Sequence, residues 1–308
     1  MKKQGENMLP IDKLSKVAKF LHIKGYVERT IKKPKRGSKH FEPRKFKNLN
    51  AAGFEIDGFP CVTADKGGKI AAHAVFLHGG AYVSEGLLLH RVFMEKLIKE
   101  HAFRVTYVDY PLAPEHGALK THEVLEKAYA FLRGKYPDDR FVLLGDSAGG
   151  GLALAFLQRL AAGAGPMPEK TVLLSPWLDV TMSRPEAAEY EKKDPTLSIE
   201  ALVFAGREYA KELDGQNPLV SPIFGNMEGL GDILVTVGTH ELFYPDCEYL
   251  KERVLGAAGS RLLLAVFKNM FHDFPMTPLK ESDIAAEVVA RFCTGKKQKE
   301  YEEVIFER

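Results

Sequence analysis

The sequence predicts an α/β fold with a mostly parallel central sheet, flanked by helices and covered by a helical cap. Three observations predict it. Apolar runs of strand length alternate with helical patterns along most of the chain, which is typical of a parallel sheet with crossover helices. One such run, 140–144, ends in a glycine-rich turn that holds a single serine. A proline-rich insertion over residues 176–228 interrupts the alternation, as expected of a lid.

The charge of the chain is unevenly distributed. The 308 residues are enough to bury a full core, and we expect one domain. Residues 1–50 hold 15 lysines and arginines against 4 acidic residues, whereas the rest of the chain holds 28 against 37. Such a basic segment is common in proteins that bind nucleic acid or anionic membranes. Here the lysines alternate with apolar residues at helical spacing, so we interpret them as the solvated face of a cap helix and expect no nucleic-acid partner.

The cysteines and the hydropathy pattern predict a cytoplasmic protein. Cys61, Cys247 and Cys293 are far apart and form no C-x-x-C pair, which argues against a disulfide framework or a zinc site. No apolar run approaches the roughly 18 residues of a membrane span. The lysine-containing N-terminus has no apolar stretch with the form of a signal-peptide core. We therefore expect a soluble protein with no membrane span.

The N-terminal 50 residues predict an arm or part of a cap. Apolar residues follow helical spacing over 10–22. Residues 32–37 are rich in lysine, proline and glycine, which predicts an exposed, mobile connection. Neither segment has the pattern of a buried core element.

From residue 54 onward the sequence predicts alternating strands and helices. Strands are expected at short apolar runs bounded by turn residues, and helices where apolar residues recur every three or four positions. Two prolines within 110–115 exclude a helix there, so this segment is extended. The predicted strands are 54–63, 70–77, 104–109, 140–144, 171–174, 233–237 and 262–267, and the predicted helices are 86–101, 118–134, 148–162, 246–257 and 280–293.

The turn after the run at 140–144 has the form G-x-S-x-G, with Ser147 between Gly145 and Gly149. This pattern is typical of a sharp strand-to-helix turn that presents a serine nucleophile, and its glycines make room for the bend. A serine among small residues also occurs in ordinary glycine-rich turns. The interpretation of Ser147 as a nucleophile therefore depends on whether the chain supplies its partners.

A base and an acid follow Ser147 in the expected order. A serine hydroxyl needs a base to take its proton and a carboxylate to orient that base, and in this type of fold the chain order is serine, acid, histidine. Only His272 follows a plausible acid at the end of the strand 233–237. For the acid we favour Glu241, because Asp246 has an alternative role as the N-cap of the next helix.

A glycine turn earlier in the chain predicts an oxyanion hole. Backbone N–H groups that point at a developing negative charge are often the largest catalytic contribution. Gly79 and Gly80 follow a predicted strand and offer two such groups, and Ala148, directly after the serine, offers the third. Two glycines after a strand also form plain turns, but their position ahead of a G-x-S-x-G turn favours the catalytic interpretation. Asp146 is expected to have a structural, hydrogen-bonding role.

With these residues in place, the chain resembles the hormone-sensitive-lipase-like family of α/β-hydrolases, the bacterial family IV carboxylesterases. The likeness covers about residues 70 to 294. It rests on several motifs in the family's order, which is far more specific than the serine turn alone. These motifs are His78-Gly79-Gly80, Tyr110 with Leu112-Ala113-Pro114-Glu115, Gly145 to Gly150, Ser175-Pro176-Trp177 and Phe271-His272.

Two departures from the family pattern bear on the site. The family usually has a third glycine where this chain has Ala81, which affects the crowding near the acyl group. It usually has an aspartate where this chain has Glu241, although some members use glutamate, and this keeps Asp246 open as an alternative acid.

The resemblance implies a serine carboxylesterase that acts on small, short-acyl esters without a metal or organic cofactor. Ser147 would carry the acyl group, His272 would act as general base and acid, and Glu241 would orient it. The same triad also suits an amidase or deacetylase of acylated small molecules. A non-catalytic receptor of the same fold is a further alternative, against which the presence of His272 argues. The family often forms dimers, which suggests a homodimer.

The resemblance also implies how the chain is divided. Residues 51–175 and 229–294 would form the catalytic domain, and residues 1–50 with the insertion 176–228 would form a two-part cap over the acyl and alcohol pockets. Residues 295–308 would be a charged, peripheral tail. Candidate residues of the pocket wall are Tyr82, Trp177, Phe204, Leu242 and Phe271.

Overall fold

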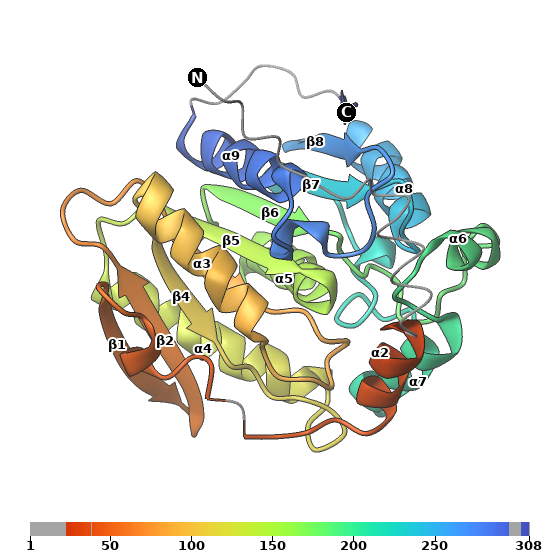
Figure 1. Cartoon of the computed structure of the whole chain (residues 1–308), viewed down its shortest axis with the longest axis horizontal. Coiled ribbons are helices and arrows are strands. Elements are labelled where there is room, and N and C mark those ends of the chain that lie inside the picture. Colours follow the sequence, from red (N-terminus) through yellow and green to blue (C-terminus); the bar gives the residue numbers. More distant parts are fainter. Residues whose placement is uncertain (1–22, 38, 296–302, 308) are drawn as a thin grey trace, which may run out of the picture.

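A nine-stranded sheet with helices on both faces forms the body of the computed structural model, which describes residues 23–37, 39–295 and 303–307 (Figure 1). The strand order is β1-β2-β4-β3-β5-β6-β7-β8-β9, and only the β1–β2 and β2–β4 pairs are antiparallel. The predicted α/β class is therefore confirmed. The strands are β1 Asn50–Ile56, β2 Phe59–Asp65, β3 His73–Leu77, β4 Arg104–Val108, β5 Phe141–Asp146, β6 Lys170–Leu174, β7 Gly231–Gly238, β8 Ser260–Phe267 and β9 Val304–Phe306.

The central strands are buried on both faces, so the sheet separates two apolar cores. Along β3, Val75 and Leu77 belong to one core and Ala74 and Phe76 to the other, as the two-residue period of a strand requires. Helices α4, α5 and α8 supply the first core, and α3 and α9 supply the second (Figure 1). Their bounds are α3 Leu88–His101, α4 Ala118–Lys135, α5 Ser147–Arg159, α8 Tyr244–Leu255 and α9 Lys280–Thr294.

Three short helices lie together near the carboxyl ends of the parallel strands (Figure 1). They are α2 (Ile23–Lys32), α6 (Ala187–Lys193) and α7 (Ile199–Ala210). Helix α2 packs against α7, and α7 also contacts α6. The two helices of the proline-rich insertion thus share this side of the molecule with the N-terminal segment. The helix predicted over 10–22 lies outside the described residues.

The predicted strand over 54–63 is wrong, because this segment folds into two strands. β1 and β2 form an antiparallel hairpin in which Ile56 lies opposite Phe59. The turn residues Asp57 and Gly58 both have positive φ, 51° and 83°. An Asp-Gly pair strongly predicts a two-residue hairpin turn. Because the alternating pattern of a strand runs on both sides of this pair, that pattern predicts one strand over the whole segment.

Two other segments form contacts with distant residues that the sequence did not predict. The connection 32–37 is exposed at all positions but Pro34, as predicted, yet Arg36 donates a hydrogen bond to the Ala113 carbonyl at 2.7 Å and pairs with Glu115 at 2.6 Å. The tail was predicted to be peripheral, yet β9 extends the sheet beside Ala265–Phe267 of β8.

The turn between β5 and α5 leaves no room for side chains at its glycines. A Cβ on Gly145 would lie 2.2 Å from the Gly149 carbonyl oxygen, and one on Gly149 would lie 2.0 Å from the Leu77 carbonyl oxygen. Both obstacles are backbone atoms, so no rotamer change relieves them.

We therefore expect Gly149→Ala to lower the free energy of unfolding by at least the ~1–3 kcal/mol that is typical of overpacking. Gly134→Ala in α4 is the matched control, since a Cβ there meets nothing within 4 Å. Alanine favours the helix, so this control should be neutral or more stable by about 1 kcal/mol. Urea unfolding of both variants measures the difference, and equal stabilities would contradict the prediction.

Candidate active site

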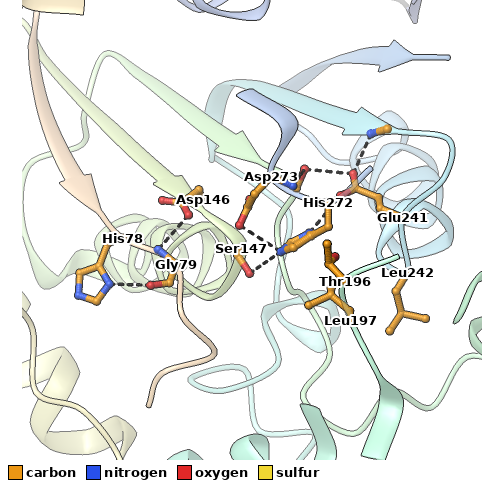
Figure 2. A network of polar contacts seen from close by, with 12 residues as sticks. His78, Gly79, Asp146, Ser147, Thr196, Leu197, Glu241, Leu242, His272 and Asp273 are labelled. Carbon is orange, nitrogen blue, oxygen red and sulfur yellow. Dashed lines mark hydrogen bonds and ion pairs between the residues drawn. The ribbon is translucent and has the colours of Figure 1, made fainter. Parts of the chain in front are cut away.

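Ser147 lies at the tip of the turn between β5 and α5. Its φ is 51°, in the left-handed region that costs energy for a residue with a side chain. The Trp177 N–H donates to the Ser147 carbonyl at 2.9 Å and so holds the turn from a neighbouring segment. The strained conformation presents the Ser147 hydroxyl to the loop that follows β8 (Figure 2).

The structure brings together Ser147, His272 and Glu241, three residues that the sequence places far apart (Figure 2). The Nε2 atom of His272 lies 3.0 Å from Ser147 Oγ, and its Nδ1 atom lies 3.1 Å from Glu241 Oε2. The Phe243 ring meets the imidazole edge-on, with 5.0 Å between ring centroids. This is the geometry of a nucleophile, a base and an orienting acid.

Neutral donors fix the Glu241 carboxylate in the interior. Its Oε1 atom accepts hydrogen bonds from the Gly238 N–H at 2.8 Å and from the Ser175 hydroxyl at 3.1 Å. Burial raises the pKa of Glu241, and the hydrogen bonds from His272, Gly238 and Ser175 oppose that rise. The remaining oxygen, Oε2, is left to face His272.

Asp246, the alternative acid, faces Arg184 at 3.6 Å rather than His272. Its predicted role as an N-cap is also wrong, because α8 begins at Tyr244 and places Asp246 in the first turn. Burial, followed by the nearby Asp179 carboxylate, raises the pKa of Asp246 to about 7.

The prediction that Gly79 donates to the oxyanion is contradicted by its hydrogen bond. Its N–H donates to Asp146 Oδ2 at 3.0 Å and is therefore already occupied (Figure 2). His90 Nε2 lies 3.1 Å from the same oxygen, while His90 Nδ1 accepts from the Leu87 N–H at 2.8 Å. Because Nδ1 accepts, Nε2 carries the proton, and His90 is a neutral donor to Asp146.

Other backbone N–H groups near Ser147 remain unpaired. Within the described part of the chain, the N–H groups of Gly80 and Ala81 have no hydrogen-bond acceptor. Both residues have positive φ, 122° and 54°. The Ala148 N–H belongs to the first turn of α5, where a helix offers no internal partner.

His78 supports this turn from the side of the sheet. Its Nδ1 atom lies 2.7 Å from the Gly79 carbonyl oxygen, and its ring stacks on Tyr110 with 4.4 Å between centroids. The Tyr110 hydroxyl donates to the His78 carbonyl at 2.6 Å. Burial lowers the pKa of His78 to about 4, so the ring is neutral at physiological pH.

The five residues predicted for the pocket wall differ in burial. Tyr82 and Trp177 are fully buried in the core, and Tyr82 stacks on Tyr209 with 3.7 Å between centroids. Phe204, by contrast, is 40% exposed. Leu242 is buried and Phe271 half-buried. Aromatic residues around the site thus serve mainly to pack the short helices onto the sheet.

Asp194 is a buried residue that the sequence analysis missed. Its carboxylate accepts from the Leu242 N–H at 2.9 Å, and also from the N–H groups of Thr196 at 2.7 Å and Leu197 at 3.0 Å. It thereby ties the segment between α6 and α7 to the loop that carries Glu241. An Asp-Pro pair in the sequence signals only a turn, and nothing local indicates a partner at Leu242.

Asp273 was missed as well, although it directly follows His272. Its Oδ2 atom lies 3.1 Å from His272 Nε2, the nitrogen that also faces Ser147. Its φ of 54° turns the chain back toward that nitrogen. Sequence spacing alone gives no indication of this contact.

The described residues hold neither a cluster suited to a metal ion nor a helix suited to a membrane. No group of three or more histidine, cysteine, aspartate or glutamate side chains is arranged to hold a metal ion there. Within the same residues, no helix combines the length and apolar character needed to cross a membrane.

Comparison with known proteins identifies the family. Residues 74–276 match the model of a family with the α/β-hydrolase fold. The chain belongs to that family. It is 33% identical over 224 residues to an esterase of Acinetobacter venetianus, a match that covers 71% of this chain and 73% of the relative. It is 31% identical over 199 residues to an acetyl-hydrolase of Streptomyces hygroscopicus, covering 64% and 66% of the two chains.

A solved structure supports the same grouping. The crystal structure of EstE7, a hormone-sensitive-lipase homologue from a metagenome library, is similar with a TM-score of 0.80 and 27% identity, and the match covers 93% of this chain and 98% of that one. The predicted resemblance to the hormone-sensitive-lipase-like esterases is therefore confirmed, and the protein is a carboxylic ester hydrolase.

The contacts of Glu241 and Asp246 predict that mutating them has very different effects on kcat. Glu241→Gln should lower kcat for an ester by about 10³- to 10⁴-fold, because an amide no longer stabilises the protonated imidazole. Asp246→Asn should leave kcat nearly unchanged. Rates are normalised to the fraction of protein labelled by a fluorophosphonate. A greater loss of kcat in Asp246→Asn would show that the acid is misassigned.

Proposed function

We propose that the protein hydrolyses small, short-acyl carboxylic esters through an acyl-enzyme on Ser147. The observation that carries this proposal is the continuous set of contacts from Glu241 through His272 to Ser147, with separations of 3.1 and 3.0 Å. The proposed chemistry uses these side chains, backbone N–H groups and water.

In the acylation step, Ser147 Oγ attacks the ester carbonyl carbon while its proton passes to His272 Nε2. Glu241 stabilises the imidazolium that forms. The tetrahedral intermediate then collapses: the bond to the alcohol oxygen breaks, and His272 gives its proton to that oxygen. The alcohol leaves, and the acyl group remains on Ser147.

In the deacylation step, water takes the place of the alcohol. His272 Nε2 accepts a proton from the water as its oxygen attacks the acyl carbon. Collapse of the second intermediate breaks the bond to Ser147 Oγ, and His272 returns the proton to that oxygen. The carboxylic acid product leaves and the free enzyme is restored.

We propose that the N–H groups of Gly80, Ala81 and Ala148 bind the oxyanion, with Ala81 in place of the predicted Gly79. Their lack of other acceptors supports this assignment, as does the positive end of the α5 dipole at Ser147. Removing one such donor typically costs about 3–4 kcal/mol of transition-state stabilisation. The left-handed conformations of Gly80 and Ala81 turn consecutive N–H groups in one direction.

The segment around the triad supports a short acyl group. Leu197 and Leu242 are both buried, with exposed fractions of 5% and 1%, and their backbone N–H groups both donate to the Asp194 carboxylate. We propose that this segment, with α2, α6 and α7, forms the cap that limits acyl length. The relative named as an acetyl-hydrolase is in keeping with a small acyl group.

Loss of either central residue should abolish turnover. We expect Ser147→Ala and His272→Ala each to lower kcat/KM for p-nitrophenyl acetate by about 10⁴-fold or more, because the nucleophile or its base is gone. His101→Ala, which removes a histidine at the far end of α3, is the matched control and should keep its activity. Circular dichroism checks that each variant is folded. Substantial turnover by Ser147→Ala would contradict the proposed function.

The substrate class is tested by varying the length of the acyl group and by comparing an ester with an amide. Across p-nitrophenyl acetate, butyrate, octanoate and palmitate, kcat/KM should fall steeply beyond butyrate if the proposed cap limits the length of the acyl group. A matched acetanilide measures the predicted alternative of an amidase or deacetylase. Faster hydrolysis of the palmitate would contradict the short-acyl proposal, and faster hydrolysis of the anilide would favour the alternative.

A further inference from the structure

His272 is surrounded by an unusual excess of carboxylates. Glu241 Oε2 lies 3.1 Å from its Nδ1 atom, and Asp273 Oδ2 lies 3.1 Å from its Nε2 atom. A third carboxylate, Asp146, is close enough to Asp273 to raise the pKa of that residue, which burial already raises. Among the described residues, no lysine or arginine forms an ion pair with any of the three.

The contact between Asp273 and His272 requires a proton. In a simple triad the neutral imidazole carries its proton on Nδ1, toward the acid, and offers a lone pair at Nε2 to the serine hydroxyl. Here Nε2 faces Asp273 Oδ2 at 3.1 Å, and two acceptors at that separation repel each other unless one of them is protonated. The contact is therefore favourable only when the imidazole carries one proton more than it does in a simple triad.

We propose that, in the resting enzyme, Asp273 favours a proton on the Nε2 atom of His272, and that this proton must be lost before His272 can act as a base. Asp273 is then a positioning residue that sets the pH at which the esterase becomes active. The inference rests on the proposed function, because it concerns the base of that reaction.

The proton balance explains how this contact controls activity. While the extra proton is present, Nε2 has no lone pair and cannot accept the proton of Ser147 Oγ. Release of that proton to solvent leaves a neutral imidazole beside an ionised Asp273. Ser147 then donates its hydrogen bond to Nε2, and acylation proceeds as described above.

Burial and the nearby carboxylates act in opposite directions on the pKa of His272, and the carboxylates prevail. Burial lowers its pKa, but Asp273 and Glu241 outweigh this and hold the pKa of His272 well above its usual range. Beyond them lie the Asp146 carboxylate and His90, whose pKa burial lowers but Asp146 raises more strongly, and the Phe243 ring is uncharged. The catalytically competent, neutral His272 therefore forms only as the pH rises.

The acid limb of the pH profile is the range in which activity rises with pH. We expect Asp273→Asn to move the acid limb of kcat/KM for p-nitrophenyl acetate to lower pH by about one unit or more, a tenfold gain in relative activity on that limb. Asparagine suits the experiment because it has the shape of aspartate and tolerates the left-handed conformation of this position. The pH dependence of the rate at which a fluorophosphonate labels Ser147 should shift in the same direction.

Three further variants control for structural effects. Asp138→Asn removes the same charge from an exposed site before the amino end of β5, whereas Ser147 follows the carboxyl end of that strand, and it should leave the acid limb in place. Asp273→Glu retains the charge and should keep the limb near that of the wild type. Asp273→Gly is a second uncharged variant that accepts the backbone conformation, in case the asparagine variant folds poorly.

An acid limb that stays at the wild-type pH in both uncharged variants would overturn the inference. This outcome is distinct from failure of the proposed function. If Ser147→Ala retains its activity, the triad itself is wrong. If Ser147→Ala and His272→Ala are inactive while the limb does not move, the triad stands and only the role of Asp273 is wrong.

Discussion

The close approach of three backbone segments at the β5–α5 turn is the constraint on which the rest of the site depends. Because Gly149 has no side chain, the end of β3 can lie against it. Gly151 likewise leaves room for the Trp177 carbonyl oxygen, which a Cβ on Gly151 would approach to 2.1 Å. This contact brings the turn after β3 and the segment after β6 to either side of Ser147. The strained φ of Ser147 is maintained because both neighbours hold the turn.

The carboxylates of the site are stabilised by neutral donors instead of cations. Glu241 receives the Gly238 N–H and the Ser175 hydroxyl, Asp146 receives the Gly79 N–H and neutral His90, and Asp194 receives backbone N–H groups. Such hydrogen bonds stabilise a buried charge without neutralising it. The negative potential of these carboxylates therefore acts on the imidazole of His272, the base of the triad.

Sequence reasoning predicted the fold class and the order of Ser147, Glu241 and His272, because both depend on local patterns and on chain order. It failed where a contact depends on the direction in which a side chain or an N–H group points in the folded chain. A glycine pair indicates available N–H groups, but not that Asp146 takes the one on Gly79. The contacts of Asp194 with Leu242 and of Asp273 with Nε2 likewise follow from how loops meet at the edge of the sheet. The hairpin at Asp57 was the one miss for which a local signal existed.

Strand β9 has a consequence for how the protein is handled. It covers Ala265–Phe267 of β8, and the Lys268 N–H donates to the Phe306 carbonyl at 3.2 Å just before the loop that carries His272. An uncovered strand edge is a template for pairing with another chain. Trimming the charged tail to simplify expression would bare this apolar edge and promote aggregation, so recombinant versions are best kept intact beyond Phe306.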